Sequence, residues 1–523
     1  MRGVAAVLFL LSMQLFLLAE AAKILTVSFV GGSHYFLLDE ISRVLHERGH
    51  EVRMLQTDNL FSSGGYTNRD PKDYQITTCS FEDDYAKELK AWFSELQKEF
   101  LKGRAGLRCY LELMDHFAFQ CNIVLKQSAI LNSLRHEKFD IAIIDAFNPC
   151  VFLVIEKLGL PFIAFFPGTF INLGQVDIPR PLSYIPMPRS LLSDHMDFWE
   201  RVKNVFIYFV YQVVNMQLQA KFDHVIEAHF QAGSRPTLSD LYQKSELWIY
   251  NTDLTIEFPR PLLPNTIYIG SLLAKPAKPL SQELEDFIGQ SGEAGFIIVT
   301  MGSMVTSIEQ LDIVKEMNAA FARLPQKVIW RYQRSRWPKE LKLAPNVKIM
   351  DWLSQNDLLG HPKARLFVTH GGINSVMESI YHGVPVVGIP LFGDQFDNMV
   401  RVEAKQIGIS LPPYQLTADR FAKAMKQILE DDKYKRAAVA LSKIQQLAPF
   451  AADEMLIHWV EHIIHSGGGT HLRPYGSQQP WYQQYLLDVA FFLAASLALV
   501  AYCCVKLVKI ISKMICPQKL KQT

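Results

Sequence analysis

This 523-residue sequence has almost no excess of charge of either sign: 53 basic residues stand against 52 acidic ones and leave a net charge of +1. Such a balance creates no general electrostatic field for a polyanion, so we expect no nucleic-acid partner. The sequence also has no N-x-S/T sequon. We therefore expect no N-linked glycan, even if the chain enters a secretory compartment.

Cysteine is scarce as well. Seven cysteines, four in the main body and three near the C-terminus, are too few and too scattered for a disulfide scaffold. We expect free buried thiols, and leave open a bond between Cys121 and Cys150 in an oxidising compartment. Whether the three C-terminal cysteines are acylated also stays open. The other five are Cys79, Cys109, Cys503, Cys504 and Cys516.

Metal-binding motifs are missing with one exception. No C-x-x-C pair occurs, but residues 46–50 match H-E-x-x-H. A zinc site of that type needs both histidines on one face of a continuing helix. Gly49 is a natural helix stop and residues 51–55 suit a strand, so His50 is expected in a turn. We expect no metal and no cofactor.

The two ends of the chain carry long apolar runs. Residues 1–22 fit a secretory signal peptide, which we favour over an uncleaved anchor because the run is too short to span a bilayer comfortably. Residues 485–508 suit a transmembrane helix, and the tail 509–523 is basic without an acid. The last five residues resemble a K-x-K-x-x retrieval signal, although a merely basic flank is the alternative. These features predict a single-pass type I protein of the endoplasmic reticulum membrane with a lumenal body.

The length allows two domains of Rossmann size plus extensions. Residues 81–133 are expected to be helical, as are residues 191–230, whose apolar run 206–211 we assign to core packing rather than to a membrane surface or a greasy acceptor. Helices after Thr417 and over residues 433–446 are expected to close the second domain and cross back. Buried strands are expected at residues 23–30, 51–55, 139–144, 161–166, 246–251, 296–300, 328–331, 347–350, 365–369 and 384–389.

A histidine and an aspartate each follow one of these strands. His34 comes after residues 23–30, and Asp145 ends the run 139–144. Ligands of parallel sheets collect at the carboxyl ends of strands. A carboxylate that accepts from one imidazole nitrogen fixes the tautomer, so that the other nitrogen can take a proton from a hydroxyl. A loop histidine satisfied by backbone is the structural alternative for His34 alone.

A second constellation follows residues 365–369. The strand ends in His370-Gly371-Gly372, and a helix is expected over residues 373–382. A glycine turn at a helix N-terminus offers free N–H groups to an anion such as a phosphate. Polar side chains that suit oxygen ligands follow in the helix and after the next strand; an ordinary αβ crossover is the alternative. These side chains are Asn374, Ser375, Glu378, Asp394 and Gln395.

The 47 residues 352–398 together resemble the signature of the UDP-glycosyltransferases, which are inverting enzymes with two Rossmann-like domains (the GT-B architecture). The similarity covers nearly the whole chain and is closest to the membrane-bound vertebrate enzymes, particularly their small third subfamily. It implies that His34 is the base and Asp145 its orienting partner. In the donor site, the resemblance implies that Trp352 stacks on uracil, Gln355 contacts the nucleoside and Glu378 binds the ribose. Asp394 and Gln395 are expected to bind the donor sugar. The residues expected at the diphosphate are Ser303, His370, Gly372, Asn374 and Ser375.

The resemblance also implies a domain plan within an α/β fold. We expect a signal peptide at 1–22, an acceptor-binding Rossmann-like domain at 23–273, a proline-rich linker at 274–284 and a donor-binding Rossmann-like domain at 285–450. A crossover and membrane-proximal segment at 451–484, the transmembrane helix 485–508 and a cytosolic tail 509–523 complete the plan.

The expected reaction is transfer of a sugar from a UDP-sugar to a hydroxyl of a small lipophilic acceptor without metal. No D-x-D motif is present, which argues against the metal-dependent fold. Ser375 and Gly393 replace the Gly and Ala common in the glucuronosyl branches. A glucuronate carboxylate would also need a cation near Asp394 and Gln395. The first one that follows them in sequence is Arg401, although Arg260 could reach the carboxylate in space. We expect UDP-glucose or UDP-N-acetylglucosamine as donor, with Phe392 biasing the choice.

The alternatives are a UDP-glucuronosyltransferase and a non-catalytic membrane partner that regulates sibling transferases. The sequence leaves the acceptor and the oligomeric state, homo- or hetero-oligomeric with related transferases, open.

Overall fold

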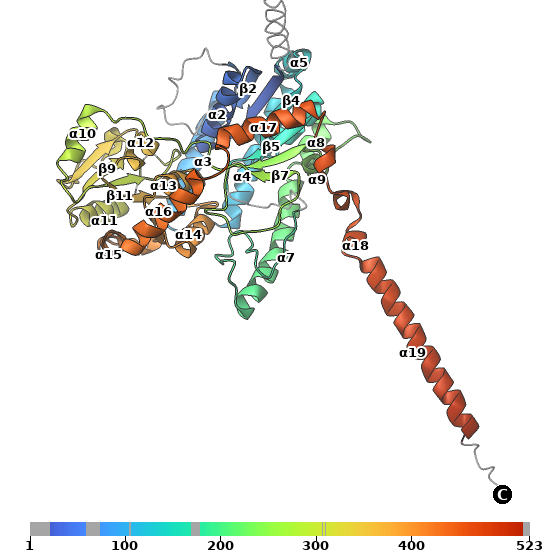
Figure 1. Ribbon diagram of the computed structural model, residues 1–523. Coiled ribbons are helices and arrows are strands. Elements are labelled where there is room, and N and C mark those ends of the chain that lie inside the picture. The colour runs from blue at the N-terminus through green and yellow to red at the C-terminus, as the bar shows by residue number, and fades with distance from the viewer. Residues whose placement is uncertain are drawn as a thin grey trace, which may run out of the picture. The chain divides into compact units, whose positions relative to one another are not determined.

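The computed structural model describes residues 21–58, 74–103, 106–168, 178–305, 307–308 and 310–515 (Figure 1). Most of the expected signal peptide and the basic tail with its retrieval-like end lie outside these residues. The chain divides into two units, residues 1–471 and 472–523, which are described separately.

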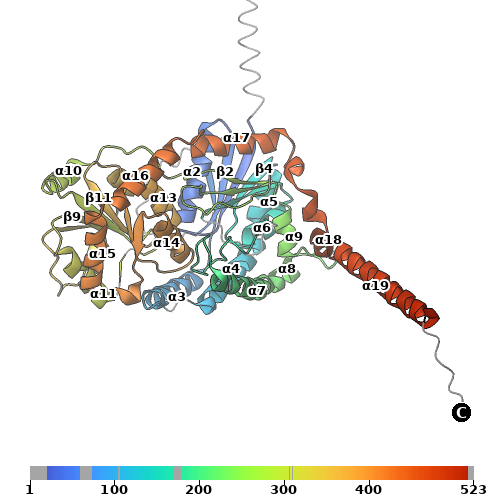
Figure 2. The ribbon, with the colours of Figure 1, turned by 60° about the horizontal axis from the view of Figure 1, so that its bottom comes forward.

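The larger unit contains two wholly parallel sheets with helices around them (Figures 1 and 2). The first has the strand order β3-β2-β1-β4-β5-β6-β7, and we call it and its helices the first lobe. The chain moves outward from β1 in one direction and then continues from β4 in the other, so β1 and β4 flank the switch point at which ligands bind in such sheets. The strands are β1 (Lys23–Ser28), β2 (Glu51–Thr57), β3 (Gln75–Cys79), β4 (Ile141–Asp145), β5 (Phe162–Phe166), β6 (Leu247–Tyr250) and β7 (Thr266–Tyr268).

The second sheet repeats this plan with the order β10-β9-β8-β11-β12-β13, and its switch point lies between β8 and β11. We call it and its helices the second lobe. Both sheets confirm the expected fold of two Rossmann-like halves. The strands are β8 (Phe296–Thr300), β9 (Lys327–Arg331), β10 (Val347–Met350), β11 (Ala364–Thr369), β12 (Val386–Gly388) and β13 (Gly408–Ser410).

Every strand expected from an apolar run is present. β4, β5, β6 and β8 are buried along their whole length, which explains why their sequences are apolar runs. Three strands were not expected. β3 is largely exposed, and β7 and β13 have only three residues each. All three lie at sheet edges, where a strand needs no continuous apolar run.

The helices flank both sheets (Figure 2). The helices of the larger unit are α2 (Ser33–Glu47), α3 (Asp83–Leu101), α4 (Leu107–Lys126), α5 (Ser128–His136), α6 (Cys150–Leu158), α7 (Phe198–Ala220), α8 (Asp223–His229), α9 (Leu238–Gln243), α10 (Gln282–Gly289), α11 (Leu311–Phe321), α12 (Gln355–Leu359), α13 (Ile373–Tyr381), α14 (Gln395–Ala404), α15 (Ala418–Glu430), α16 (Asp432–Gln446) and α17 (Ala452–His465).

Two helices link the lobes, the first of them in a way that the sequence did not predict. The end of α3 joins the hydrophobic core of the second lobe through Leu96, Phe100 and Leu101, although its neighbours in sequence belong to the first. The chain returns to the first lobe through α17, which lies in the segment 451–484 expected as a crossover, and not through α16. Glu461 of α17 lies 2.8 Å from Arg48, just after α2.

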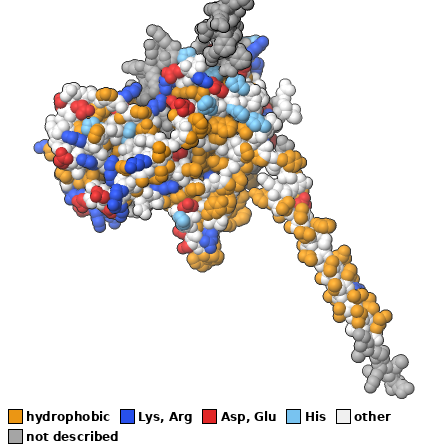
Figure 3. All heavy atoms as spheres, in the orientation of Figure 1, with side chains coloured by type: hydrophobic (Ala, Val, Ile, Leu, Met, Phe, Trp, Pro, Cys, Tyr) orange, Lys and Arg blue, Asp and Glu red, His pale blue; other side chains and the backbone are white. Residues whose placement is uncertain are grey.

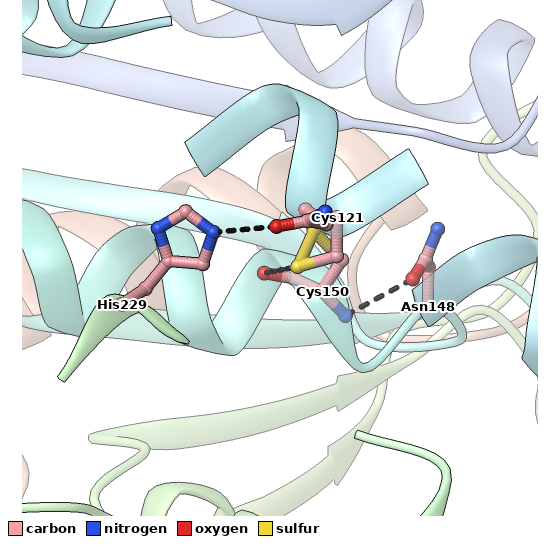
Figure 4. Close-up of a disulfide and its surroundings, with 5 residues drawn as sticks. Cys121, Asn148, Cys150 and His229 are labelled. Carbon is pink, nitrogen blue, oxygen red and sulfur yellow. Dashed lines mark hydrogen bonds between the residues drawn. A yellow bond between two sulfur atoms is a disulfide. The ribbon is translucent and has the colours of Figure 1, made fainter. Parts of the chain in front are cut away.

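The expectation of free thiols at Cys121 and Cys150 was wrong, because the two sulfurs form a disulfide (Figure 4). Packing of α4 against α6 brings the two Cα atoms to 5.3 Å, a separation typical of disulfides. Asn148 fixes the start of α6 by accepting from the Cys150 N–H at 3.0 Å. The bond therefore ties two helices of the first lobe covalently.

The H-E-x-x-H segment does not form a continuous helix. α2 ends at Glu47, and Gly49 has φ 107°, so the chain turns before β2. His50 is buried in that turn, where its Nδ1 accepts from the Ala22 N–H at 3.2 Å. Among the described residues, no group of three or more histidine, cysteine or acidic side chains is placed to hold a metal ion.

Helix α7 contradicts the expectation of core packing for residues 206–211. It projects from the body, and only Asn204 and Leu218 of its 23 residues are buried. Phe206 is 67 % exposed and Phe209 63 % exposed. The apolar run covers more than one face of the helix, and the body covers too little of that helix to bury it.

The smaller unit contains α18 (Trp481–Gln484) and α19 (Leu487–Ile515). Residues Leu487–Met514 of α19 are long and apolar enough to cross a membrane. This agrees with the expected span, and the helix continues past residue 508.

Candidate active site

His34 and Asp145 meet at the switch point of the first sheet. Asp145 ends β4 and is fully buried, and His34 is the second residue of α2, the helix that follows β1. The distance between His34 Nδ1 and Asp145 Oδ2 is 3.0 Å. The other carboxylate oxygen accepts from the Phe147 N–H at 3.1 Å, and the Phe147 ring lies edge-on against the imidazole with centroids 4.9 Å apart.

This arrangement orients the imidazole on two sides. An ionised carboxylate can only accept, so its contact with Nδ1 places the hydrogen there and leaves Nε2 as the acceptor. The His34 side chain is 22 % exposed while Asp145 is fully buried. The pair can therefore take a proton from a group that reaches Nε2.

The helix α13 begins on the second lobe with the glycine turn predicted from sequence. Gly371 has φ 82°, a conformation that favours glycine, and Gly372 caps the helix. The His370 ring lies between Gly302 and Gly372; a Cβ at either glycine would approach the ring to 2.5 and 2.7 Å. Burial, helped by the charge of Arg331, lowers the pKa of His370 to about 4, so the ring is neutral at physiological pH.

Polar side chains of α12 and α13 form a network beside this turn. The Gln355 amide donates to Ser375 Oγ at 3.1 Å and also to Glu378. Burial raises the pKa of Glu378 to about 8. A carboxyl group in this state can donate one hydrogen bond as well as accept, which suits a ligand with hydroxyl groups.

An aromatic platform stands beside this network. The Arg331 guanidinium lies over the Trp352 ring at 4.7 Å from its centroid, and Phe36 of the first lobe contacts the same ring edge-on at 6.2 Å. Arg331 also donates to the Gly302 carbonyl. Sequence reasoning missed Arg331. Its position at the carboxyl end of β9, equivalent to those of the residues that were selected, was the available signal.

Asp394 and Gln395 lie at the start of α14. The Gln395 side-chain oxygen accepts from the N–H groups of Leu391 and Phe392 at 2.8 and 3.0 Å, which leaves its NH₂ group as a donor. Asp394 accepts from Asn398 at 2.7 Å. Burial raises the pKa of Asp394, and this rise is opposed first by the hydrogen bond from Asn398 and more weakly by the electrostatic interaction with His34. Asp394 and His34 are thus electrostatic neighbours although they belong to opposite lobes.

Most of these groups line one cavity of about 720 Å³ between the lobes. Of the thirteen residues selected from sequence, twelve line it, and Asp145 lies behind His34. The twelve are His34, Ser303, Trp352, Gln355, His370, Gly372, Asn374, Ser375, Glu378, Phe392, Asp394 and Gln395. Phe36, Phe147 and Phe166 add an apolar wall from the first lobe that sequence reasoning did not identify.

Hydrogen bonds and ion pairs cross the junction around this cavity. The Asn251 amide, which follows β6, donates to Asn374 Oδ1 at 2.8 Å. Arg401 of α14 pairs with the buried Glu257 at 3.2 Å. The cavity is therefore lined by two lobes that hold each other by specific polar contacts.

Comparison with known proteins agrees with this geometry. Residues 22–522 match the model of the family described as "UDP-glucoronosyl and UDP-glucosyl transferase". The chain is 53 % identical to UDP-glucuronosyltransferase 3A1 of Xenopus laevis, over 98 % of each chain. It is 35 % identical to 2-hydroxyacylsphingosine 1-beta-galactosyltransferase of Homo sapiens, over 91 % of this chain and 88 % of that one.

Among solved structures, the glycosyltransferase of kitacinnamycin superposes with a TM-score of 0.58 at 19 % identity, covering 85 % of this chain and 99 % of that one. That likeness supports the two-sheet fold. The match along nearly the whole chain, together with the cavity between two parallel sheets, places this chain in the UDP-glycosyltransferase family, as a UDP-sugar-dependent transferase related to its third, vertebrate subfamily.

Proposed function

We propose that this chain transfers a neutral sugar, glucose or N-acetylglucosamine, from its UDP derivative to a hydroxyl group of a small lipophilic acceptor, without a metal ion. The observation that carries this proposal is the His34–Asp145 pair, which meets the same cavity as the start of α13. A base and an anion site on opposite walls suit direct displacement between two substrates.

In the proposed reaction the acceptor oxygen attacks the anomeric carbon while its proton passes to His34 Nε2. The bond from that carbon to the diphosphate oxygen breaks, UDP leaves, and the configuration at the carbon inverts. Asp145 stabilises the imidazolium that forms. The N–H groups at the start of α13, together with Ser303, stabilise the growing charge on the diphosphate.

The remaining donor contacts follow from the arrangement of the cavity. We assign uracil to the Trp352 ring, the nucleoside to Gln355 and the ribose hydroxyls to Glu378. The sugar hydroxyls are assigned to Asp394 and the Gln395 NH₂ group. The diphosphate is assigned to His370, Gly372, Asn374 and Ser375. The division of labour follows the domain plan expected from sequence, with the donor on the second lobe and the acceptor on the first.

A neutral sugar is favoured by the state of the nearby cations. A glucuronate carboxylate requires a cation, and the described cations that line the cavity are Arg43, Lys275, Lys278 and Arg331. Arg43 and Lys275 both pair with Glu40, and Arg331 lies on the Trp352 ring. Arg401, the cation nearest to Asp394 in sequence, is paired with Glu257.

Phe392 is the residue that we assign to donor choice. It lines the cavity beside Asp394 and Gln395, and its ring stacks on Phe100 of α3 at 4.5 Å. The stacked pair fills space at the sugar end, so a larger substituent on the sugar would have to displace an aromatic ring.

UDP-glucuronate is the alternative donor, because the Xenopus laevis relative is named a glucuronosyltransferase. The galactosyltransferase relative, whose name states a neutral sugar and a lipid acceptor, favours the proposal. The test is UDP release by the full-length chain with UDP-glucose, UDP-N-acetylglucosamine or UDP-glucuronate and a phenolic or steroid acceptor, with His34→Ala as the inactive control. We expect one of the neutral donors to be fastest; fastest release from UDP-glucuronate would overturn the donor assignment.

We further propose that the chain is a type I protein of the endoplasmic reticulum membrane with a lumenal body. The candidate span Leu487–Met514 supports anchoring. The Cys121–Cys150 bond supports an oxidising compartment for the body, since such bonds are rare in the cytosol. Protection of the body from protease in intact microsomes, lost on adding detergent, is the expected result.

A further inference from the structure

Two long helices of the first lobe, α7 and α3, place their apolar side chains in opposite surroundings. Most of those on α7 are exposed, and hydrophobic side chains cover much of this projecting helix in Figure 3. At the end of α3, in contrast, Leu96, Phe100 and Leu101 are buried in the core of the second lobe. Tyr85 and Leu89, near the start of α3, belong to the core of the first lobe. Helix α3 therefore reaches from one lobe into the other.

Gln97 lies on the face of α3 that enters the second lobe. It precedes Phe100 by three residues and Leu101 by four, and residues at these spacings share a helix face. Its side-chain NH₂ group donates to the Met304 carbonyl at 3.1 Å. Met304 and its neighbour Ser303 both line the cavity between the lobes. A side chain of the first lobe thus holds the backbone of the second lobe at the cavity wall.

Ser303 lies in the middle of a short segment after β8, residues 301–305, which we call the β8 loop. The residues on either side of Ser303 both have a carbonyl that accepts from a side chain. Arg331 of the second lobe donates to the Gly302 carbonyl, and the bond from α3 fixes the Met304 carbonyl. The conformation of the β8 loop around Ser303 therefore depends on donors from both lobes.

The turn that precedes His34 contacts the same loop. Gly32 caps the start of α2 with φ 66°, and a Cβ placed there would lie 2.9 Å from Ser303 Oγ and 3.0 Å from Met304 Cγ. Only a residue without a side chain fits into so little space. Two elements of the first lobe, the start of α2 and the end of α3, thus contact the β8 loop. One of them is the helix that carries His34.

We propose that Gln97 is a positioning residue of the donor site, which places Ser303 against the diphosphate by holding the β8 loop from the first lobe. This inference rests on the proposed contact between Ser303 and the diphosphate. The contacts proposed for uracil and ribose, at Trp352 and Glu378, come from other segments of the second lobe. Gln97 therefore acts on the phosphate end of the nucleotide and not on its uridine end.

The test compares the binding of UDP and of uridine to the full-length chain. Gln97→Met removes the hydrogen-bond donor and keeps a side chain of similar length. The loss of one neutral hydrogen bond is expected to weaken UDP binding by about two- to twelvefold, measured by calorimetry. Uridine, which has no phosphate, is expected to bind with its wild-type affinity, measured by displacement of UDP.

Gln127→Met is the matched control. The Gln127 side chain also donates to a carbonyl at 3.1 Å, that of Ser80, and neither residue lines the cavity. This control is expected to bind both ligands as the wild type does. Wild-type UDP affinity in Gln97→Met would overturn the proposal. An equal weakening of UDP and uridine would overturn it as well, because it would indicate a general defect of the site.

A double variant tests whether Gln97 acts through Ser303. Once Ser303 is alanine, Gln97→Met is expected to weaken UDP binding by less than about twofold, because the hydroxyl that it places is gone. The same factor in both backgrounds would contradict the proposal. Wild-type UDP affinity in Ser303→Ala would remove the diphosphate contact and this inference together. Because binding is measured without turnover, a chain that transfers no sugar but keeps the difference between UDP and uridine would contradict the proposed function and support this inference.

Discussion

Replacing Asp145 by asparagine tests the proposed base without removing it. The asparagine side chain has the same shape, and its oxygen can keep the hydrogen bond from the Phe147 N–H. Its NH₂ group would then face His34 Nδ1, where a carboxylate oxygen now lies at 3.0 Å. A donor at that position forces Nδ1 to accept and moves the imidazole hydrogen to Nε2. The nitrogen that should take the acceptor proton would already carry one.

The size of the loss follows from the contacts that change. A hydrogen bond to a charged group contributes about 1.5–3 kcal/mol. At about 1.4 kcal/mol for each factor of ten, losing its support for the imidazolium lowers kcat by roughly 10- to 150-fold. The reversed tautomer adds to this, up to the whole contribution of a general base, about 10²- to 10⁴-fold. His34→Ala is expected at that upper limit.

The assay is steady-state UDP release by wild type, both single variants and the double variant, with UDP affinity measured by calorimetry. Asp145 acts through His34 alone, so Asp145→Asn should have almost no further effect once His34 is alanine. All four proteins should bind UDP equally, because we assign UDP to the other lobe. Losses that multiply in the double variant would refute the assignment of Asp145 as the partner of the base. A single Asp145→Asn variant within threefold of wild type would refute it too.

Other predictions concern the donor lobe and the fold. Burial raises the pKa of Glu378 from 4.5 to about 8 in the folded protein. Between these two pH values the folded chain therefore holds more protons than the unfolded one. Its stability falls by up to about 1.4 kcal/mol for each pH unit of increase in this window. In thermal melts Glu378→Gln, neutral throughout, should therefore gain on wild type as pH rises from 5 to 8. Phe392→Ala should raise the kcat/KM of UDP-N-acetylglucosamine relative to UDP-glucose, and Phe100→Ala should move the ratio in the same direction by a smaller factor; unchanged ratios in both would remove the pair from donor choice. The paired change of Cys121 and Cys150 to serine should destabilise the protein by about 3–4 kcal/mol, given a separation of 29 residues, and no shift of the melting midpoint would contradict a structural role.

The fold could be predicted wherever a strand is buried on both faces. β8 (Phe296–Thr300) was found at its expected bounds because it is a short apolar run that is buried along its whole length in a parallel sheet. β3 could not be found in this way, since its residues are mostly exposed and do not alternate between apolar and polar. Helix α7 failed for the opposite reason. Its apolar run looks like a core segment in sequence, and only the arrangement of the described residues shows that most of its side chains are exposed.

The residues of the candidate site could be predicted where a reactive or polar side chain lies at the carboxyl end of a strand. His34, Asp145 and His370 each follow a buried strand, and parallel sheets collect such residues at one edge. What sequence could not supply is the contact between the two edges. The bond from Asn251 to Asn374 joins residues 123 apart, and no local pattern encodes the partner of either one.

The same distinction explains why Arg331 was missed and why it matters. Within its own strand it is the last residue of a buried run, and a buried arginine there has no local reason. The burial of Arg331 is explained by two groups from elsewhere in the chain. The Trp352 ring lies against its guanidinium, and the Gly302 carbonyl accepts a hydrogen bond from it. Burial lowers the pKa of Arg331 only to about 10, so it keeps its charge at neutral pH and lies in the cavity wall next to the turn of α13. A cation in that position joins the platform proposed for uracil to the loop proposed for the diphosphate, so both ends of the nucleotide site depend on one side chain that no motif marks.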